Sequence, residues 1–257
     1  MAEDLLFRRA KQVVFASATV NMKTLELLGV RKEQVRVIEQ ESNFPVRNRP
    51  IYYCPVARVG REMGELDRRR LHDAIDATIQ TRAVDRGMKG IVQTVSYRFA
   101  REILERSKYR HENLFILDES GMSTSAKVED YRRRRGAAVL LSPAVQEGLN
   151  FPGAECEFQI LPKMPFPDMS DPLIQAKKKV DKDYIPYVVL QTVVQCTGRH
   201  VRSEVDRGET WILDGHYTWL SGGYYRYLPR WFTSAIKTLP MRIGVEDLPE
   251  PLDKIRG

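Results

Sequence analysis

The sequence predicts an α/β fold with an open, mainly parallel sheet flanked by helices. Two observations support this prediction. Short runs rich in valine, isoleucine and leucine recur along the chain, which is typical of strands buried on both faces of a parallel sheet. Segments with helical character lie between these runs, and such alternation favours right-handed crossover connections.

The apolar runs predict six strands, at residues 12–19, 90–97, 113–119, 137–143, 158–165 and 209–215. Three helices are predicted between them, at residues 68–86, 97–107 and 186–202. The sequence has no internal repeat, and its Pro-rich stretches are too short to divide domains. We therefore expect one domain over residues 1–235 and a loose C-terminal tail over residues 236–257.

Polar residues gather where the predicted strands end. These residues are Ser17, Thr19, Thr94, Ser96, Ser142 and Asp214. Ligands of open α/β sheets bind beyond the carboxyl ends of the strands. We therefore expect the functional site at this single edge of the sheet.

The composition is that of a globular protein with an anionic partner. The chain has 257 residues, 42% hydrophobic and 29% charged, which is enough to bury a sizeable core. Its 41 basic and 34 acidic residues give a net charge of +7, and nucleic acid is the most frequent partner of such proteins. The three cysteines form no C-x-x-C pair, so they suggest free thiols rather than a zinc site or a disulfide framework. Without a signal peptide or an apolar run of about 20 residues, we expect no membrane contact and a cytoplasmic location, nucleoid-associated in a prokaryote.

One short stretch, "QCTGRHVRS" at residues 195–203, has an unusual arrangement of polar groups. On a helix, residues three and four apart share a face, so Gln195, Arg199 and Arg202 would point the same way. Such a row is either a solvated basic surface or a device that grips an anion. The stretch alone leaves both interpretations open.

Four motifs in order decide between them. "SAT" (17–19) is followed by "GIVQTVSY" (90–97), "LLSPAVQEGLNFPG" (140–153) and "QCTGRHVRSEVDRGETWILD" (195–214). Together they resemble motifs III, IV, V and VI of the C-terminal motor domain of XPD/DinG-like superfamily-two DNA helicases. The resemblance covers roughly residues 12–235 and includes "ESNFPVRNRPIYY" before motif IV. It implies a RecA-like domain, a second helicase lobe related to P-loop NTPases but without its own P-loop.

The resemblance also implies roles at a nucleotide cleft between two lobes. Arg202 would be the arginine finger on the γ-phosphate, Arg199 a second phosphate contact and Gln195 a helper. Arginine suits this task because its planar guanidinium stays charged and donates to two phosphate oxygens. Cofactor-binding roles would fall to four neighbouring positions of motifs V and VI: Glu147, Gly148, Asn150 and Gly198. Asn150 departs from the family, which commonly has aspartate there. Gly198 suggests a close backbone approach to a neighbouring element.

Nucleic-acid contacts are implied for Ser142, Thr94, Ser96 and Tyr97, whose hydroxyl and backbone groups would hold phosphates without reading sequence. Ser17 and Thr19 would couple the nucleotide cleft to the nucleic-acid track. Strand ends also carry such hydroxyls merely to cap a following helix, and that alternative remains open. Another departure follows motif VI: Gly215 and His216 stand where the family usually has arginine, and His216 has no partner at metal-ligand spacing.

The sequence lacks a Walker G-x-x-x-x-G-K-[ST] loop and a D-E-x-H box, which in such motors belong to the first lobe. We therefore expect ATP and Mg²⁺ to be bound mainly by an absent first lobe, with no metal or iron–sulfur cluster in this chain. The expected partners are single-stranded DNA and an N-terminal helicase lobe, either in the same longer protein or as a separate chain.

Three hypotheses follow. The first is an ATP-dependent DNA helicase whose C-terminal half is this chain, inactive alone and supplying arginine fingers to ATP on the other lobe. The second is a catalytically inactive nucleic-acid-binding or adaptor module with the same fold, suggested by Asn150 and by the missing arginine after Asp214. A third is an unrelated α/β enzyme using Asp214 or Asp118 as an acid or base.

Overall fold

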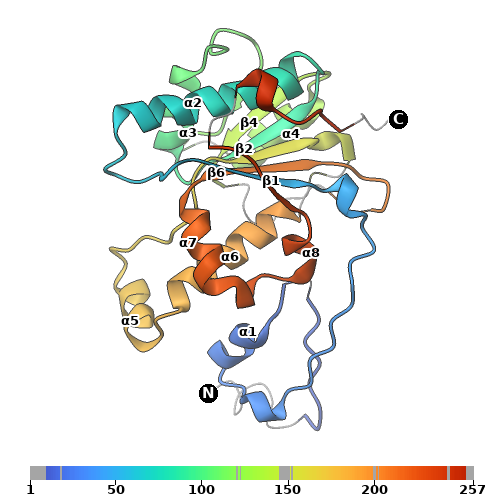
Figure 1. Cartoon of the computed structure of the whole chain (residues 1–257), viewed down its shortest axis with the longest axis vertical. Helices are drawn as coiled ribbons and strands as arrows, with labels where there is room; N and C mark the ends of the chain where they lie inside the picture. Colours follow the sequence, from blue (N-terminus) through green and yellow to red (C-terminus); the bar gives the residue numbers. More distant parts are fainter. Residues whose placement is uncertain are drawn as a thin grey trace.

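A seven-stranded sheet forms the centre of the protein in a computed structural model (Figure 1). The structure describes residues 10–17, 19–119, 121, 123–144, 151, 153–198, 201, 203–241 and 244–252. The strand order is β3-β4-β2-β5-β6-β1-β7, and every neighbouring pair is parallel. The strands are β1 (Ile51–Ala57), β2 (Lys89–Gln93), β3 (Phe115–Leu117), β4 (Ala138–Ser142), β5 (Phe158–Leu161), β6 (Glu209–Asp214) and β7 (Ile236–Thr238).

Helices cover both faces of this sheet (Figure 1). One face carries α2 (Glu65–Ile79) and α3 (Tyr97–Arg106), which bury Leu71, Ile75 and Ile103 against the strands. The other carries α6 (Tyr184–Thr197) and α7 (His216–Tyr224). The remaining helices are α1 (Met22–Leu27), α4 (Thr124–Arg133), α5 (Pro172–Val180) and α8 (Arg230–Thr233). The predicted layered α/β architecture is thus confirmed.

Close packing between strands fixes one glycine. A Cβ atom on Gly90 would lie 2.1 Å from Cζ of Phe158, far inside van der Waals contact. Phe158 is fully buried on β5, beside β2. Glycine at 90 therefore lets an aromatic ring pack directly over the backbone of β2.

Most predicted elements exist, but their limits shift. The strands near 90, 113, 137, 158 and 209 correspond to β2 to β6, and the helix predicted over 97–107 is α3. The helix predicted over 68–86 begins earlier and turns π-helical at Gln80–Val84. The helix predicted over 186–202 ends at Thr197, followed by Gly198. Strands β1 and β7 were missed.

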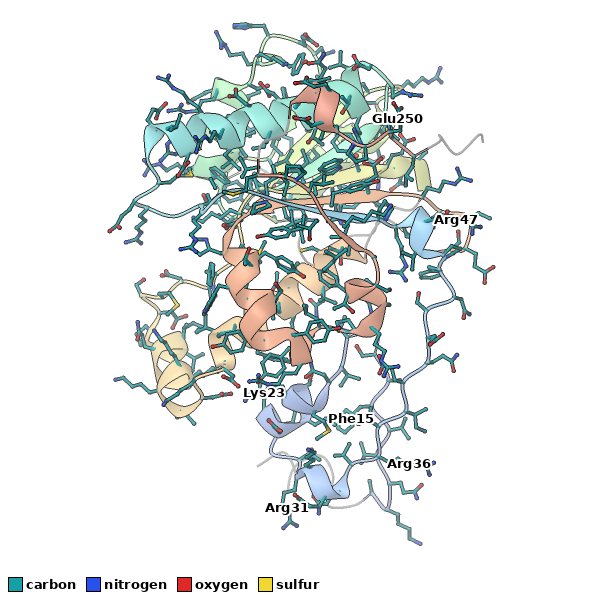
Figure 2. All side chains as sticks on the ribbon, viewed as in Figure 1. Phe15, Lys23, Arg31, Arg36, Arg47 and Glu250 are labelled. Atoms are coloured by element: carbon teal, nitrogen blue, oxygen red, sulfur yellow. The ribbon has the colours of Figure 1, made fainter. Side chains whose placement is uncertain are left out.

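The prediction of a first strand at 12–19 is wrong for the described residues, which form no strand there. No strand of the described residues pairs with this segment, and Val14 is 89% exposed. Residues 10–17 and 19–45, here called the N-terminal arm, instead run along and beyond the α6 face (Figure 2). Local apolar pattern predicted an extended conformation but could not supply a neighbouring strand.

The segment expected to form a loose tail is partly built into the domain. Ile236–Thr238 pair with β1 as strand β7. Further on, the chain passes over the α2 face, where Glu250 lies (Figure 2), and the carbonyl oxygen of Pro249 accepts a hydrogen bond of 2.6 Å from Arg82. None of the described helices is long and apolar enough to cross a membrane.

Candidate functional site

Four predicted nucleic-acid residues come together at the carboxyl ends of two adjacent strands, β2 and β4. The backbone N–H of Thr94 donates to the carbonyl of Ser142 at 3.0 Å. Ser96 follows as the N-cap of α3, and its Oγ accepts from the backbone N–H of Phe99 at 3.2 Å. Tyr97 begins the helix and is 36% exposed. The exposed residues Ser96 and Tyr97 thus surround the positive end of a ten-residue helix.

Ser142 has a different environment from Ser96 and Tyr97, and so has Thr94, which is also fully buried. The side chain of Ser142 is fully buried, and its hydroxyl donates to Oδ2 of Asp118 at 2.6 Å. Thr124 donates to the same carboxylate at 3.2 Å. In this geometry the hydroxyl of Ser142 is engaged inside the protein and holds the start of the motif V loop, rather than facing a phosphate.

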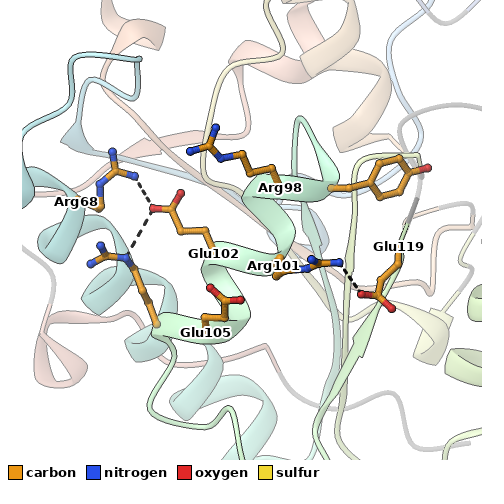
Figure 3. A pocket seen from close by; sticks show the side chains of 8 residues that line it. Arg68, Arg98, Arg101, Glu102, Glu105 and Glu119 are labelled. Atoms are coloured by element: carbon orange, nitrogen blue, oxygen red, sulfur yellow. Dashed lines mark hydrogen bonds and ion pairs between the residues drawn. The ribbon is translucent and has the colours of Figure 1, made fainter. Parts of the chain in front are cut away.

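A groove of about 610 Å³ runs along the outer side of α3 from Tyr97 (Figure 3). Carboxylates neutralise most of its arginines: Arg68 pairs with Glu102, and Arg101 pairs with Glu119 at 3.0 Å. Burial alone would raise the pKa of Glu102, but the hydrogen bond and charge of Arg68 outweigh it and lower that pKa. Arg98 differs, because it has no carboxylate within ion-pair distance among the described residues. Arg98 is therefore the cation in this groove best able to meet a phosphate.

A second group of predicted residues lines a separate pocket of about 450 Å³. Phe15, Ser17 and Thr19 of the N-terminal arm form one wall, and Gln195 lies on the facing side of α6. Gln195 is exposed, as is Ser17. The structure thus brings the described motif III residues beside the first residue of motif VI, although they are far apart in the chain.

Contacts from α1 hold this wall in place. Thr24 and Tyr187 on α6 share a hydrogen bond of 2.7 Å between their hydroxyl groups. Lys23 forms an ion pair of 2.6 Å with Asp181. Burial alone would lower the pKa of Lys23, but the bond to Asp181 outweighs it and raises that pKa. The pocket is therefore bounded by packed segments on both sides.

The two groups do not share one edge of the sheet, contrary to the prediction. α6 returns from the carboxyl end of β5 towards the start of β6, so Gln195 lies at the opposite edge from Thr94 and Ser96. The nucleic-acid candidates lie at the carboxyl edge, and the described nucleotide candidates lie near the amino edge. The sheet separates them.

Two buried polar residues that were not predicted hold segments near motif VI: Asn48 bonds the motif VI loop, and Arg49 bonds Phe44 and Trp231. The side-chain amide of Asn48 donates to the carbonyl of Glu204 at 3.0 Å, and its backbone carbonyl accepts from the N–H of Gly208 at 2.9 Å. Arg49 donates to the carbonyl of Phe44 at 3.1 Å and stacks on Trp231, with 5.6 Å between its Cζ and the ring centroid. They belong to "ESNFPVRNRPIYY", whose resemblance to the family was the signal that pointed to them.

Gly198 has more room than its predicted role requires. A Cβ atom there would lie 3.7 Å from the Trp231 ring, which is ordinary contact, and its φ is −87°. Neither crowding by described residues nor backbone conformation demands glycine at 198. Arg199, Arg202, Glu147, Gly148 and Asn150 lie outside the described residues.

The two buried aspartates proposed as alternative catalytic groups are both engaged. Asp118 accepts from Ser142 and Thr124. Asp214 is fully buried and accepts backbone N–H bonds from Met164 at 2.7 Å, His216 at 3.0 Å and Val59 at 3.2 Å. Such carboxylates hold loops together, and they favour a structural role over acid–base chemistry. Within the described ranges, no group of three potential ligands could hold a metal ion.

The helicase C-terminal domain family matches residues 82–235 of the chain. By structure, the chain is similar to S. cerevisiae Dbp5 bound to RNA and ADP BeF3, with a TM-score of 0.53, 14% identity, and 88% of this chain and 50% of that one covered. It is also similar to S. tokodaii Xpd4, with a TM-score of 0.50, 19% identity, and 82% and 41% covered. A comparison with curated proteins gave no match. The chain thus spans half or less of these solved chains and shares the RecA-like fold of a helicase lobe.

Proposed function

Because the chain belongs to the helicase C-terminal domain family of XPD/DinG-type proteins, we propose that it is the second motor lobe of an ATP-dependent DNA helicase. The observation that carries this proposal is the pocket where Ser17 and Thr19 of motif III meet Gln195 of motif VI. Motifs III and VI are far apart in the sequence, and only the fold brings them together. This juxtaposition favours a functional nucleotide-binding surface over a domain that has kept the fold but lost nucleotide binding.

In the proposed reaction, ATP and Mg²⁺ are held by a first lobe that carries the Walker loop, and this chain completes the site. The polar side chains that line the pocket are all neutral, and they include the Gln195 amide and the hydroxyls of Ser17 and Thr19. Positive charge for the γ-phosphate would come from Arg199 and Arg202, which follow Gln195 in sequence. Arg202 stabilises the charge that develops on the transferring phosphoryl group. Glu147, Gly148 and Asn150 of the motif V loop line the same nucleotide.

Single-stranded nucleic acid is proposed to bind at the carboxyl edge. Ser96, Tyr97 and the first N–H groups of α3 offer donors to phosphates, and Arg98 adds a charge that pairs with no carboxylate among the described residues. Contacts of this kind hold a backbone without reading bases, as a translocating motor requires. Dbp5, of similar fold, was solved bound to RNA and ADP BeF3, which is compatible with both ligand classes on one lobe of this kind. DNA is the substrate we infer from the XPD/DinG family.

The N-terminal arm is the surface we propose for the first lobe. It exposes the apolar side chains Val14 (89%), Ile38 (83%) and Val37 (64%), which are costly to leave in water. Arg31 and Arg36 lie on the part of the arm that extends away from the sheet (Figure 2). Because Phe15 and Ser17 line the nucleotide-side pocket, a lobe docked on the arm would also face Gln195.

Reconstitution tests the proposal directly. The chain alone, with ATP, Mg²⁺ and single-stranded DNA, should hydrolyse ATP negligibly because it has no phosphate cradle. Adding a first lobe with a Walker loop and a D-E-x-H box should give turnover that single-stranded DNA stimulates, measured as phosphate release. Robust turnover by the isolated chain would contradict the two-lobe mechanism.

A non-catalytic adaptor remains the second candidate, and Asn150 and His216 favour it because they replace residues typical of the family. It predicts the same salt-dependent binding of nucleic acid. It differs in one outcome: no first lobe with a Walker loop and a D-E-x-H box would restore hydrolysis.

The nucleic-acid edge makes a separate prediction. Arg98→Ala should weaken binding of a single-stranded oligonucleotide several-fold and reduce the slope of log K against log salt by about 0.7, the value for one lost phosphate contact. Fluorescence anisotropy at several salt concentrations measures both.

The matched control is Arg133→Ala. Arg133 is 77% exposed and pairs with Glu129 at the far end of α4, towards the opposite edge. An equal loss in the two variants would show that only net charge matters and would remove Arg98 from the track.

A further inference from the structure

A buried chain of polar groups crosses the sheet between the two proposed sites. Nε2 of Gln93, on β2, donates to Oε1 of Gln159, on β5. Nε2 of Gln159 donates in turn to the carbonyl oxygen of Cys196, on α6, at 3.2 Å, and to Oγ1 of Thr210, on β6, at 2.8 Å. Gln93 is 3% exposed, and Gln159, Cys196 and Thr210 are each 1% exposed.

The two ends of this row of polar groups lie near the two proposed binding sites. Gln93 immediately precedes Thr94, at the strand end that leads to Ser96 and Tyr97. Cys196 lies in the last turn of α6, three residues before Arg199. The last carbonyls of a helix have no partner within it, so the Gln159 amide serves as a side-chain cap for the end of α6. Two side chains therefore connect the nucleic-acid edge to the origin of the arginine segment.

Apolar side chains would ordinarily fill the buried layer between the sheet and α6. The same face of the sheet is otherwise filled by Ile91, Leu161 and Ile212. Buried amides fix directions as well as distances, because each donor must meet its acceptor. The Gln93 carbonyl oxygen, Oε1, has no hydrogen-bond partner among the described residues, so the network is open at its β2 end. A structural change at the end of β2 can therefore move the Gln93 amide without first breaking a hydrogen bond to its Oε1.

We propose that Gln93 and Gln159 are positioning residues that couple nucleic-acid binding at the β2 edge to the placement of the arginine segment after α6. The proposal rests on the proposed function and adds the route by which the two sites of this lobe influence each other. It requires no contact of either glutamine with DNA or nucleotide. Loss of the pair should leave each site intact but make them independent.

The test uses the whole 257-residue chain and a single-stranded oligothymidylate as the probe. Amide hydrogen exchange of residues 195–208 is measured with and without the oligonucleotide, for the wild type and for Gln93→Met/Gln159→Met. The double change removes both partners of the Gln93–Gln159 bond with little change in volume, and the Cys196 carbonyl and the Thr210 hydroxyl lose the Gln159 amide. We expect binding to slow exchange in this segment of the wild type. In the double variant the effect should fall at least five-fold, with oligonucleotide affinity within two-fold.

Controls separate coupling from general damage. Gln175→Met removes an amide of α5, one that donates to the carbonyl of Met169 away from both proposed sites, and should keep the wild-type response. Thermal melts of all variants check the fold. A double variant that keeps the exchange response would overturn the inference and leave the proposed function intact. A double variant that loses affinity and exchange response together, with a lowered melting temperature, would do the same. A wild-type chain that does not bind the oligonucleotide would overturn both.

Discussion

Arg202→Ala should reduce the turnover number of the two-lobe protein by about 10³ to 10⁵-fold, the range for loss of an arginine finger in phosphoryl transfer. The physical reason is the placement of charge. A guanidinium held by one lobe meets the γ-phosphate only when the other lobe presents ATP, and it stabilises the transition state more than the bound substrate. The loss should therefore appear in kcat, with little change in the concentration of ATP that gives half-maximal rate.

The measurement is steady-state phosphate release by the lobe pair, with binding of single-stranded DNA followed in parallel. DNA affinity should stay near the wild-type value, because the nucleic-acid candidates lie at the other edge of the sheet. Arg133→Ala, an exposed arginine on α4, is the control and should keep full turnover. Unchanged turnover in Arg202→Ala would remove this residue from catalysis, and a loss of DNA binding would show that the two sites are not separate.

The local sequence was sufficient to predict elements such as β2 and α3, which follow one another directly in the chain. The run at β2 is apolar because it is enclosed on both faces, and α3 follows at once with Ser96 as its N-cap. Strand β1, with Tyr52, Tyr53 and Cys54 buried, has an equally apolar pattern, but it contains Pro55 and follows a Pro-rich stretch, and both features are more typical of loops. Pro55 is tolerated at a point where the pairing register of β1 with β6 shifts.

The predictions that failed concern features that depend on contacts between distant segments of the chain. Residues 12–17 have a strand composition, but whether they form a strand depends on a neighbour, and none lies within the described chain. The motifs placed Gln195 at the nucleotide cleft and Ser17 between that cleft and the nucleic-acid track, and the two residues line one pocket. The motifs could not reveal that α6 carries Gln195 back to the opposite edge from Thr94, because that follows from the direction of the crossover.

The second large effect concerns stability. Arg82→Ala should lower the free energy of unfolding by about 3 to 5 kcal/mol, the usual cost of removing one partner of a buried ion pair. Arg82 and Glu209 are both fully buried and lie 3.1 Å apart, and the π-helical turn at Gln80–Val84 directs Arg82 into the core. The guanidinium also stacks on Trp211, with 4.8 Å between Cζ and the ring centroid, and donates to Pro249. Its loss would release the C-terminal segment from the sheet as well as leaving a charge unpaired.

Chemical denaturation of the isolated chain measures this loss in the free energy of unfolding. The pH dependence of the loss tests whether the unpaired charge of Glu209 causes it. Burial raises the pKa of Glu209, while the charge of Arg82 opposes that rise. Without Arg82 the pKa rises further, so the folded variant binds a proton more readily than the unfolded chain, and its stability is lost as pH rises. The deficit of Arg82→Ala should therefore shrink from neutral towards mildly acidic pH. Arg86→Ala breaks an ion pair with Glu250 at 3.2 Å in which both side chains are exposed, and it should cost well under about 1 kcal/mol. An equal effect of the two variants, or a deficit independent of pH, would show that the buried charge of Glu209 does not determine how this segment is held.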